Sequence, residues 1–182
     1  MEVNGYTIEP GANLRYAVLH GANLAGANLT GVTLTHARLH GANLAGANLA
    51  GANLAYANLA YANLTSANLT SADLSGANLT GANLRYANLA CANLYAATLL
   101  SVNLFYTDLS GVTMFKANLT KAKLINANLT GANLRYANLT SADLSGAKLW
   151  RADLTSANLT YANLTKAHLT KATMPDGSVK HY

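Results

Sequence analysis

Carboxylates, histidines and one thiol are the side chains of this 182-residue chain that could take part in catalysis or bind a metal. Acid–base catalysis needs such groups held within hydrogen-bond reach of one substrate. A metal site needs three or four histidine, cysteine or carboxylate ligands around one point. The candidates are Asp73, Asp108, Asp143, Asp153, Cys91, His20, His36 and His40. Whether they meet depends on the elements that carry them.

A five-residue repeat sets those elements and runs without insertion or deletion over most of the chain. From Leu14 onward, leucine fills 31 of 33 consecutive positions spaced five apart, and methionine fills the other two. Alanine stands two residues before that position in 29 of the 33 repeats. Asparagine fills the position between them in 20 repeats and aspartate in four. The repeat unit is therefore Ala-(Asn/Asp)-Leu-x-x.

A period of five fits neither an α-helix nor a flat strand. On a helix, five residues rotate by a net angle of about 140°, so the leucines would spread around the axis. On a strand, residues five apart point to opposite faces, whereas the alanine and leucine of one repeat share a face. A short extended segment followed by a turn in each repeat brings every alanine and leucine inward. The sequence therefore predicts an all-β solenoid whose Asn and variable positions face water.

Unbroken tandem copies of Ala-(Asn/Asp)-Leu-x-x resemble the pentapeptide repeat family over residues 11–174, and the array is similar to cyanobacterial-type members. The resemblance implies a right-handed quadrilateral β-helix with four repeats in each coil. The 33 repeats then form about eight coils. Similar residues recur at a spacing of four repeats, as do His20 and His40, which agrees with such a coil.

The residues outside the repeats are expected to close the ends of the solenoid, which would otherwise expose a strand edge and the core. Residues 1–10 are predicted to form an N-terminal cap, with a strand at Tyr6-Thr7-Ile8 that leads into the β-helix of residues 11–174. Pro175-Asp176-Gly177 is typical of a turn. Residues 175–182 are therefore predicted to form a C-terminal turn and cap.

A coil of four repeats stacks side chains that are four repeats apart and keeps the candidate catalytic groups separate. No two of the four repeat aspartates are four repeats apart, and Cys91 has no histidine in its column. His20 and His40 stack, but neither a carboxylate nor a thiolate joins them, and Arg38 would repel a cation. We therefore expect no enzymatic activity, no cofactor and no metal site. The asparagines and aspartates are expected to hydrogen-bond nearby backbone groups.

The variable positions become apolar in the middle of the array, and we call these residues the apolar belt. Its members are Tyr95, Leu100, Phe105, Tyr106, Phe115 and Ile125. A coil of four repeats stacks Tyr95 with Phe115 on one face and Phe105 with Ile125 on another. Exposed apolar patches and aromatic anchors are typical of protein interfaces. The belt is therefore a candidate protein interface, and packing of its rings against the wall of the solenoid is the alternative.

The charge is modest and uneven. Twelve basic and seven acidic residues give a net charge of +5, and nine of the basic residues lie from Lys116 onward. There, a basic-aromatic group forms a weak candidate for binding anions, with a solvated surface as the favoured interpretation. We call it the anion patch, and its members are Lys148, Trp150, Arg151 and Lys171.

These patterns favour a non-enzymatic scaffold or regulator that binds a protein partner, or a second copy of the chain, through its side walls. The resemblance implies an alternative, a DNA mimic that binds DNA gyrase or topoisomerase, which the net charge of +5 disfavours because DNA is acidic. A purely structural spacer is a third interpretation. A single cysteine and the lack of a signal peptide or long apolar run predict a cytoplasmic protein without a membrane partner. A nucleic-acid partner is not favoured.

Overall fold

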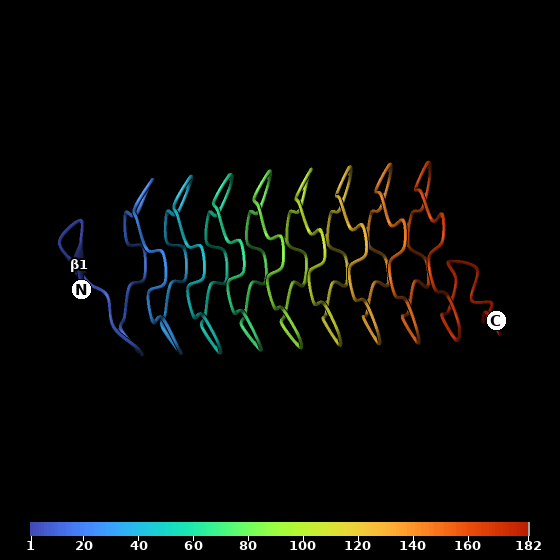
Figure 1. The fold of residues 1–182 in the computed structure, drawn as a ribbon, viewed down its shortest axis with the longest axis horizontal. Coiled ribbons are helices and arrows are strands. Elements are labelled where there is room, and N and C mark those ends of the chain that lie inside the picture. The colour runs from blue at the N-terminus through green and yellow to red at the C-terminus, as the bar shows by residue number, and fades with distance from the viewer. Residues whose placement is uncertain (182) are drawn as a thin grey trace.

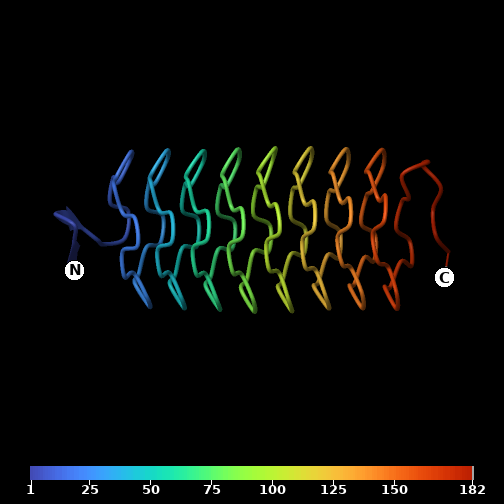
Figure 2. The same cartoon turned by 90° about the horizontal axis from the view of Figure 1, so that it is seen from above.

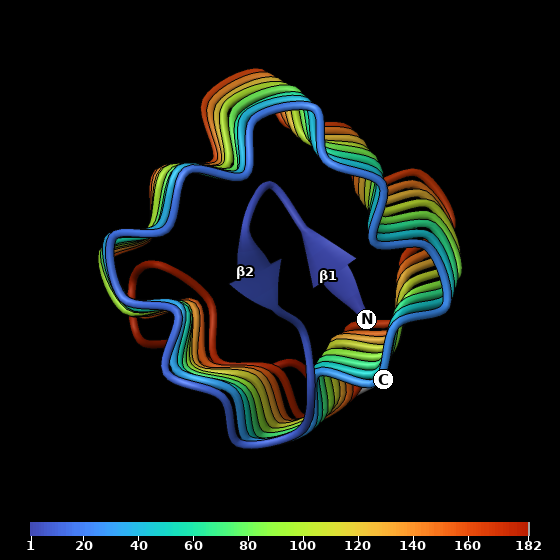
Figure 3. The same ribbon diagram turned by 90° about the vertical axis from the view of Figure 1, so that its left-hand side faces the viewer.

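The computed structural model describes residues 1–181 as a straight rod of stacked coils (Figures 1 and 2). Along its axis, the rod has a four-cornered outline (Figure 3). Parallel backbone bridges join each Asn/Asp position to the equivalent position four repeats later, from Asn13↔Thr33 to Asp153↔Thr173. Each coil therefore holds four repeats, one on each side. The predicted β-helix is confirmed at this level, whereas its right-handed sense and its count of about eight coils stay predictions of the resemblance.

In most repeats the backbone N–H groups are satisfied in the same way. The N–H of leucine and that of the second residue after it donate to carbonyls of the next coil; for Leu44 and Gly46 the bonds measure 2.7 and 2.9 Å. The Asn/Asp N–H donates to the previous coil, and the alanine N–H closes the turn. The N–H directly after leucine donates to the Asn/Asp side chain, as Ala45 does to Asn43 Oδ1 at 3.3 Å. The expected bonding between these side chains and the backbone is confirmed.

The residue directly before the alanine position of each repeat has a left-handed backbone conformation. In all 33 repeats φ at this position is positive, from 51° at Ala96 to 70° at Gly11. Glycine fills only 12 of these positions, so 21 side chains occupy a region that glycine adopts at lower cost. Seven of the ten tyrosines stand there, and all seven are exposed. The turns therefore present aromatic rings to solvent.

The predicted alanine and leucine core is confirmed. Leucines from Leu14 to Leu154 are buried, and valine replaces alanine at three buried positions. Thr107 also replaces an alanine, and its hydroxyl donates to Leu84 O at 2.8 Å. Most Asn/Asp side chains are half-buried rather than fully facing water, because neighbouring coils cover them. Three variable positions, Thr35, Ala55 and Ala60, are buried as well.

A hairpin lies across the N-terminal end of the rod (Figure 3). Strands β1 (Glu2–Val3) and β2 (Tyr6–Thr7) pair in antiparallel fashion. The sequence pattern predicts a single strand here; the Asn4-Gly5 pair, with φ of 51° and 79°, supplies the two-residue turn that makes it a hairpin. Tyr6 Oη accepts a hydrogen bond from Val18 N at 3.1 Å and so ties the hairpin to the first coil.

The C-terminal end is covered on one side only. Residues 175–177 turn the chain, and Val179 bridges back to Thr173 in antiparallel register. The hydroxyl and the N–H of Ser178 hydrogen-bond to Asp176 and hold the pKa of that carboxyl below its usual value. The leucines of the final coil, Leu159, Leu164 and Leu169, are only partly buried.

Candidate functional site

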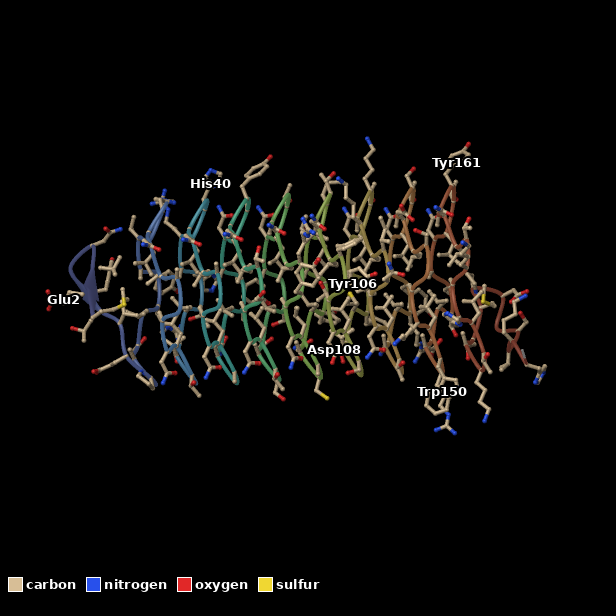
Figure 4. All side chains as sticks on the ribbon, in the orientation of Figure 1. Glu2, His40, Tyr106, Asp108, Trp150 and Tyr161 are labelled. Carbon is tan, nitrogen blue, oxygen red and sulfur yellow. The ribbon has the colours of Figure 1, made fainter. Side chains whose placement is uncertain are left out.

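Side chains that leave the wall gather at four corners, where the two residues after each leucine turn the chain. Corner I holds residues 15 and 16 and their equivalents in every fourth repeat; corners II, III and IV begin at residues 20, 25 and 30. Two repeats make half a coil, so corners I and III lie on opposite sides of the rod, as do corners II and IV. Figure 4 shows His40 and Tyr161 of corner II on one edge and Trp150 of corner IV on the other.

The apolar belt does not form one continuous patch. It divides into Tyr95 and Phe115 at corner I, Leu100 at corner II, and Phe105, Tyr106 and Ile125 at corner III. The two larger groups lie half a coil apart, so a partner that faces one does not face the other. Tyr95 and Tyr106 are exposed, whereas the other four side chains are half-buried against the wall.

The corner I group is an aromatic stack with a paired arginine. The Tyr95 and Phe115 rings lie with centroids 6.0 Å apart and planes 6° apart, which confirms their predicted stacking. Tyr136 meets Phe115 edge-on at 5.3 Å. Arg135 lies with its Cζ 5.9 Å from the Phe115 centroid, and its Nε is 3.8 Å from Asp153 Oδ2. Arg135 therefore already has a carboxylate, whereas Lys116, with its Nζ 5.5 Å from the Phe115 centroid, forms no salt bridge within residues 1–181.

The corner III group holds three rings against an arginine. Tyr86 and Tyr106 stack at 6.0 Å, and Phe105 meets them edge-on at 6.2 and 4.5 Å. Arg85 Cζ lies 5.2 Å from the Phe105 centroid and 5.4 Å from that of Tyr86, within the range of cation–π contacts. The arginine side chain is therefore held over the aromatic surface.

Beside these rings is a shallow pocket of about 220 Å³. It is lined by Arg85, Asn103, Phe105, Lys123 and Ile125, which come from three successive coils. Phe105 and Ile125 thus line one pocket, in keeping with their predicted stacking. Three of these lining residues, Arg85, Asn103 and Lys123, are not among the site residues predicted from the sequence. The sequence feature that could have revealed the pocket is the spacing of four repeats, which aligns Arg85, Phe105 and Ile125 in one column.

The structure brings three of the four anion-patch residues close together. At corner IV, Arg151 Cζ lies 4.2 Å and Lys171 Nζ 6.0 Å from the centroid of the Trp150 ring. Lys148 is exposed on the adjoining side, two residues before Trp150. The indole is thus covered by cations, and anion binding at this corner stays a prediction.

The aspartates of the repeat are committed to hydrogen bonds within the wall. Asp73 Oδ1 accepts from Ser75 N and from Asn93 Nδ2, each at 3.0 Å. Asp108 and Asp143 are bonded in the same pattern. These carboxylates therefore have the role of asparagine and form no acid–base pair with one another.

Two of the three candidate histidines, His36 and His40, pack against tyrosines. His36 is stacked between Tyr16 and Tyr56, with centroids 5.1 and 5.2 Å apart, and His40 meets Tyr61 edge-on at 5.5 Å. Within residues 1–181, no group of three or more histidine, cysteine or carboxylate side chains is placed to hold a metal ion. Over the same residues no helix has the length and apolar character needed to cross a membrane.

Similarity to known proteins agrees with the repeat pattern. The family model described as pentapeptide repeats matches residues 12–50, 47–85, 77–114, 114–151 and 137–174. No protein in the curated collection matches the chain. HetL, a pentapeptide repeat protein involved in heterocyst differentiation regulation in the cyanobacterium Nostoc sp. strain PCC 7120, is 33% identical. The alignment covers 93% of this chain and 92% of HetL, with a TM-score of 0.42.

Two further solved structures are similar. Rfr23, from the cyanobacterium Cyanothece 51142, is 42% identical over 47% of this chain and 58% of its own, with a TM-score of 0.47. QnrB1, a plasmid-mediated fluoroquinolone resistance protein, is 19% identical over 80% of this chain and 75% of its own, with a TM-score of 0.60. At that identity QnrB1 shares the fold alone. The repeat model covers nearly the whole solenoid, and the chain therefore belongs to the pentapeptide repeat family.

Proposed function

We propose that this chain is a non-enzymatic scaffold or regulator that binds a protein partner through its side walls. The observation that carries the proposal is the pair of aromatic clusters at corners I and III, each with an arginine over its rings. Aromatic and arginine side chains on a rigid support are the usual anchors of protein interfaces. The asparagines, aspartates and leucines are occupied in the wall and core, which leaves the corner residues to make contacts.

The DNA-mimic alternative is less well supported. A mimic of DNA needs an acidic surface, whereas this chain carries +5 and four of its seven acidic residues are repeat aspartates within the wall. The likeness to QnrB1 is one of fold. We also propose a right-handed rod of about eight coils, as the family resemblance implies. The cytoplasm is the compartment we propose for it, because its one cysteine, Cys91, is free and exposed.

The test is capture of partners from a host lysate by three folded variants and the unaltered protein. One variant carries Tyr95→Thr and Phe115→Thr at corner I, and another carries Phe105→Thr and Ile125→Thr at corner III. The control is Tyr161→Thr, which changes a ring that is 86% exposed at corner II. We expect one corner variant to lose a partner that the control retains.

If all four proteins capture the same background, the scaffold proposal fails and the structural-spacer interpretation replaces it. Circular dichroism checks that each variant is folded, and light scattering detects a second copy of the chain as the partner. A supercoiling assay with DNA gyrase tests the alternative, and we expect no inhibition. Inhibition by this cationic rod would show that the charge argument is wrong.

A further inference from the structure

The pocket at corner III combines an apolar floor with two cations. Phe105 and Ile125 are half-buried and form the floor, whereas Arg85 and Lys123 are exposed at the rim. The rings of Tyr86 and Tyr106 pack edge-on against Phe105 and limit its movement. The floor is therefore held in one arrangement before anything binds, which lowers the entropic cost of binding.

The two cations of this pocket form no salt bridge with a carboxylate within residues 1–181. None of its lining residues is acidic. Asp143, one coil beyond Lys123, uses its Oδ1 to accept bonds from Ser145 N and Asn163 Nδ2. Over residues 1–181, the one salt bridge of the structure joins Arg135 to Asp153. Arg85 and Lys123 are therefore available to an external carboxylate.

The size of the pocket indicates what it can hold. Sites for small-molecule ligands usually enclose about 300–1,000 Å³ and bury most of the ligand. This pocket is about 220 Å³ and shallow, which suits one or two side chains of a larger molecule. A carboxylate bound between the two cations would leave part of the Phe105 ring exposed. An apolar side chain next to that carboxylate would cover the ring.

We propose that this pocket binds an acidic segment of a protein partner. A carboxylate of the segment lies between Arg85 and Lys123, and an adjacent apolar side chain packs on Phe105 and Ile125. The proposal rests on the proposed scaffold function, because it takes the partner to be a protein. It adds the chemistry of the partner and assigns the contact to corner III rather than corner I.

The test uses the full chain, labelled with ¹⁵N, and a synthetic probe, acetyl-Ser-Glu-Phe-Glu-Ser-amide. We expect backbone amide shifts to concentrate at the five lining residues. Replacement of both glutamates of the probe by glutamine is expected to weaken binding at least tenfold, because hydrogen bonds to charged groups are lost. Arg85→Gln and Lys123→Gln are each expected to weaken binding of the acidic probe to a similar degree. Added salt should weaken it too.

The matched control is Arg135→Gln, which removes an arginine that also lies over a phenylalanine but is already paired with a carboxylate. It is expected to leave probe binding unchanged. Equal binding of the glutamine probe, equal loss in Arg135→Gln, or shifts centred on Trp150 would each overturn the proposal. Equally tight binding of free phenylacetate would overturn it as well, because the site would then select a small acid.

The two proposals can fail separately. In one outcome, a captured partner is lost only when corner I is mutated, and the probe causes no shifts at corner III. This outcome would support the scaffold function and refute the proposed binding of an acidic segment at the pocket. Probe binding at corner III without any captured protein that depends on a corner would support the pocket chemistry and refute the scaffold.

Discussion

The Asn/Asp side chain joins the backbone of its own repeat to the neighbouring coil. Asn63 Oδ1 accepts the N–H of Thr65 at 3.2 Å, and Asn63 Nδ2 donates to Asn43 Oδ1 at 3.3 Å. Aspartate can make the first bond but has no donor for the second. The side chain of Asp73 accordingly only accepts hydrogen bonds. This difference explains why both residue types fit the position and why they are not equivalent.

Asn63→Ala is therefore expected to lower the free energy of unfolding by about 1–2 kcal/mol, because it leaves the half-buried N–H of Thr65 without its acceptor. Asn63→Asp is expected to cost less, because it retains that acceptor. Urea denaturation followed by circular dichroism gives both values. Equal losses for the two variants would mean that the bond between coils, which both substitutions remove, dominates over the bond within the repeat.

At the scale of the element, each turn places one residue in the left-handed region, and its side chain can lie over the turn of the next coil. Tyr56 illustrates this arrangement, because its ring covers Gly76 of the next coil. A Cβ at Gly76 would lie 2.5 Å from Tyr56 Cε1, whereas a Cβ at Gly46 would have no atom within 4 Å. The two glycines share nearly the same φ, 63° and 65°. They differ only in what lies over them.

Gly46→Ala is expected to cost about 1 kcal/mol, the strain of alanine in a left-handed turn. Gly76→Ala is expected to cost more, by up to about 1 kcal/mol, because Tyr56 must move and loses its stacking on His36. Combining each change with Tyr56→Ala checks the cause in a double-mutant cycle. In that background the two glycine substitutions should cost the same. If Gly76→Ala still cost more than Gly46→Ala in that background, contact with the Tyr56 ring would not be the reason for the difference.

At the scale of the whole molecule, the two ends of the rod differ. The hairpin β1–β2 closes the N-terminal end, whereas the last coil has no complete cover within residues 1–181. In that part of the chain, the N–H groups of Leu159, Leu164 and Leu169 have no backbone acceptor, although their equivalents in earlier coils do. In a solenoid each coil is stabilised mainly by its neighbours, so unfolding should begin at the C-terminal end.

Leu84→Ala, in the middle of the rod, is expected to cost about 2–5 kcal/mol, because the leucine is fully buried and its loss leaves a cavity. Leu164→Ala is expected to cost much less, because this side chain is already partly exposed and its coil has one neighbour. Denaturation measures the two losses, and hydrogen exchange should show the Leu164 amide exchanging faster than the Leu84 amide. Equal protection of the two amides would contradict opening from the C-terminal end.

Much of the architecture follows from the sequence alone. The period of five and the alternation of alanine and leucine determine that the chain folds as a β-solenoid with those residues inside, because no helix or flat strand buries both. The spacing of four repeats between Tyr95 and Phe115 was sufficient to predict their stacking. The hairpin was not predicted although Asn4-Gly5 is a known signal for one, because strands of two residues are too short to show an alternation of apolar and polar side chains.

The placement of the candidate sites was decided by the tertiary structure. Half a coil separates Tyr95 from Phe105, so residues that form one belt along the sequence face opposite directions. The pocket arises from side-chain conformations in three successive coils, with Arg85 drawn over Phe105 by its contacts with the rings. A repeating sequence determines the backbone because most repeats make the same hydrogen bonds with the neighbouring coils. Which side chains meet at a corner depends on individual rotamers, and only the three-dimensional packing selects those.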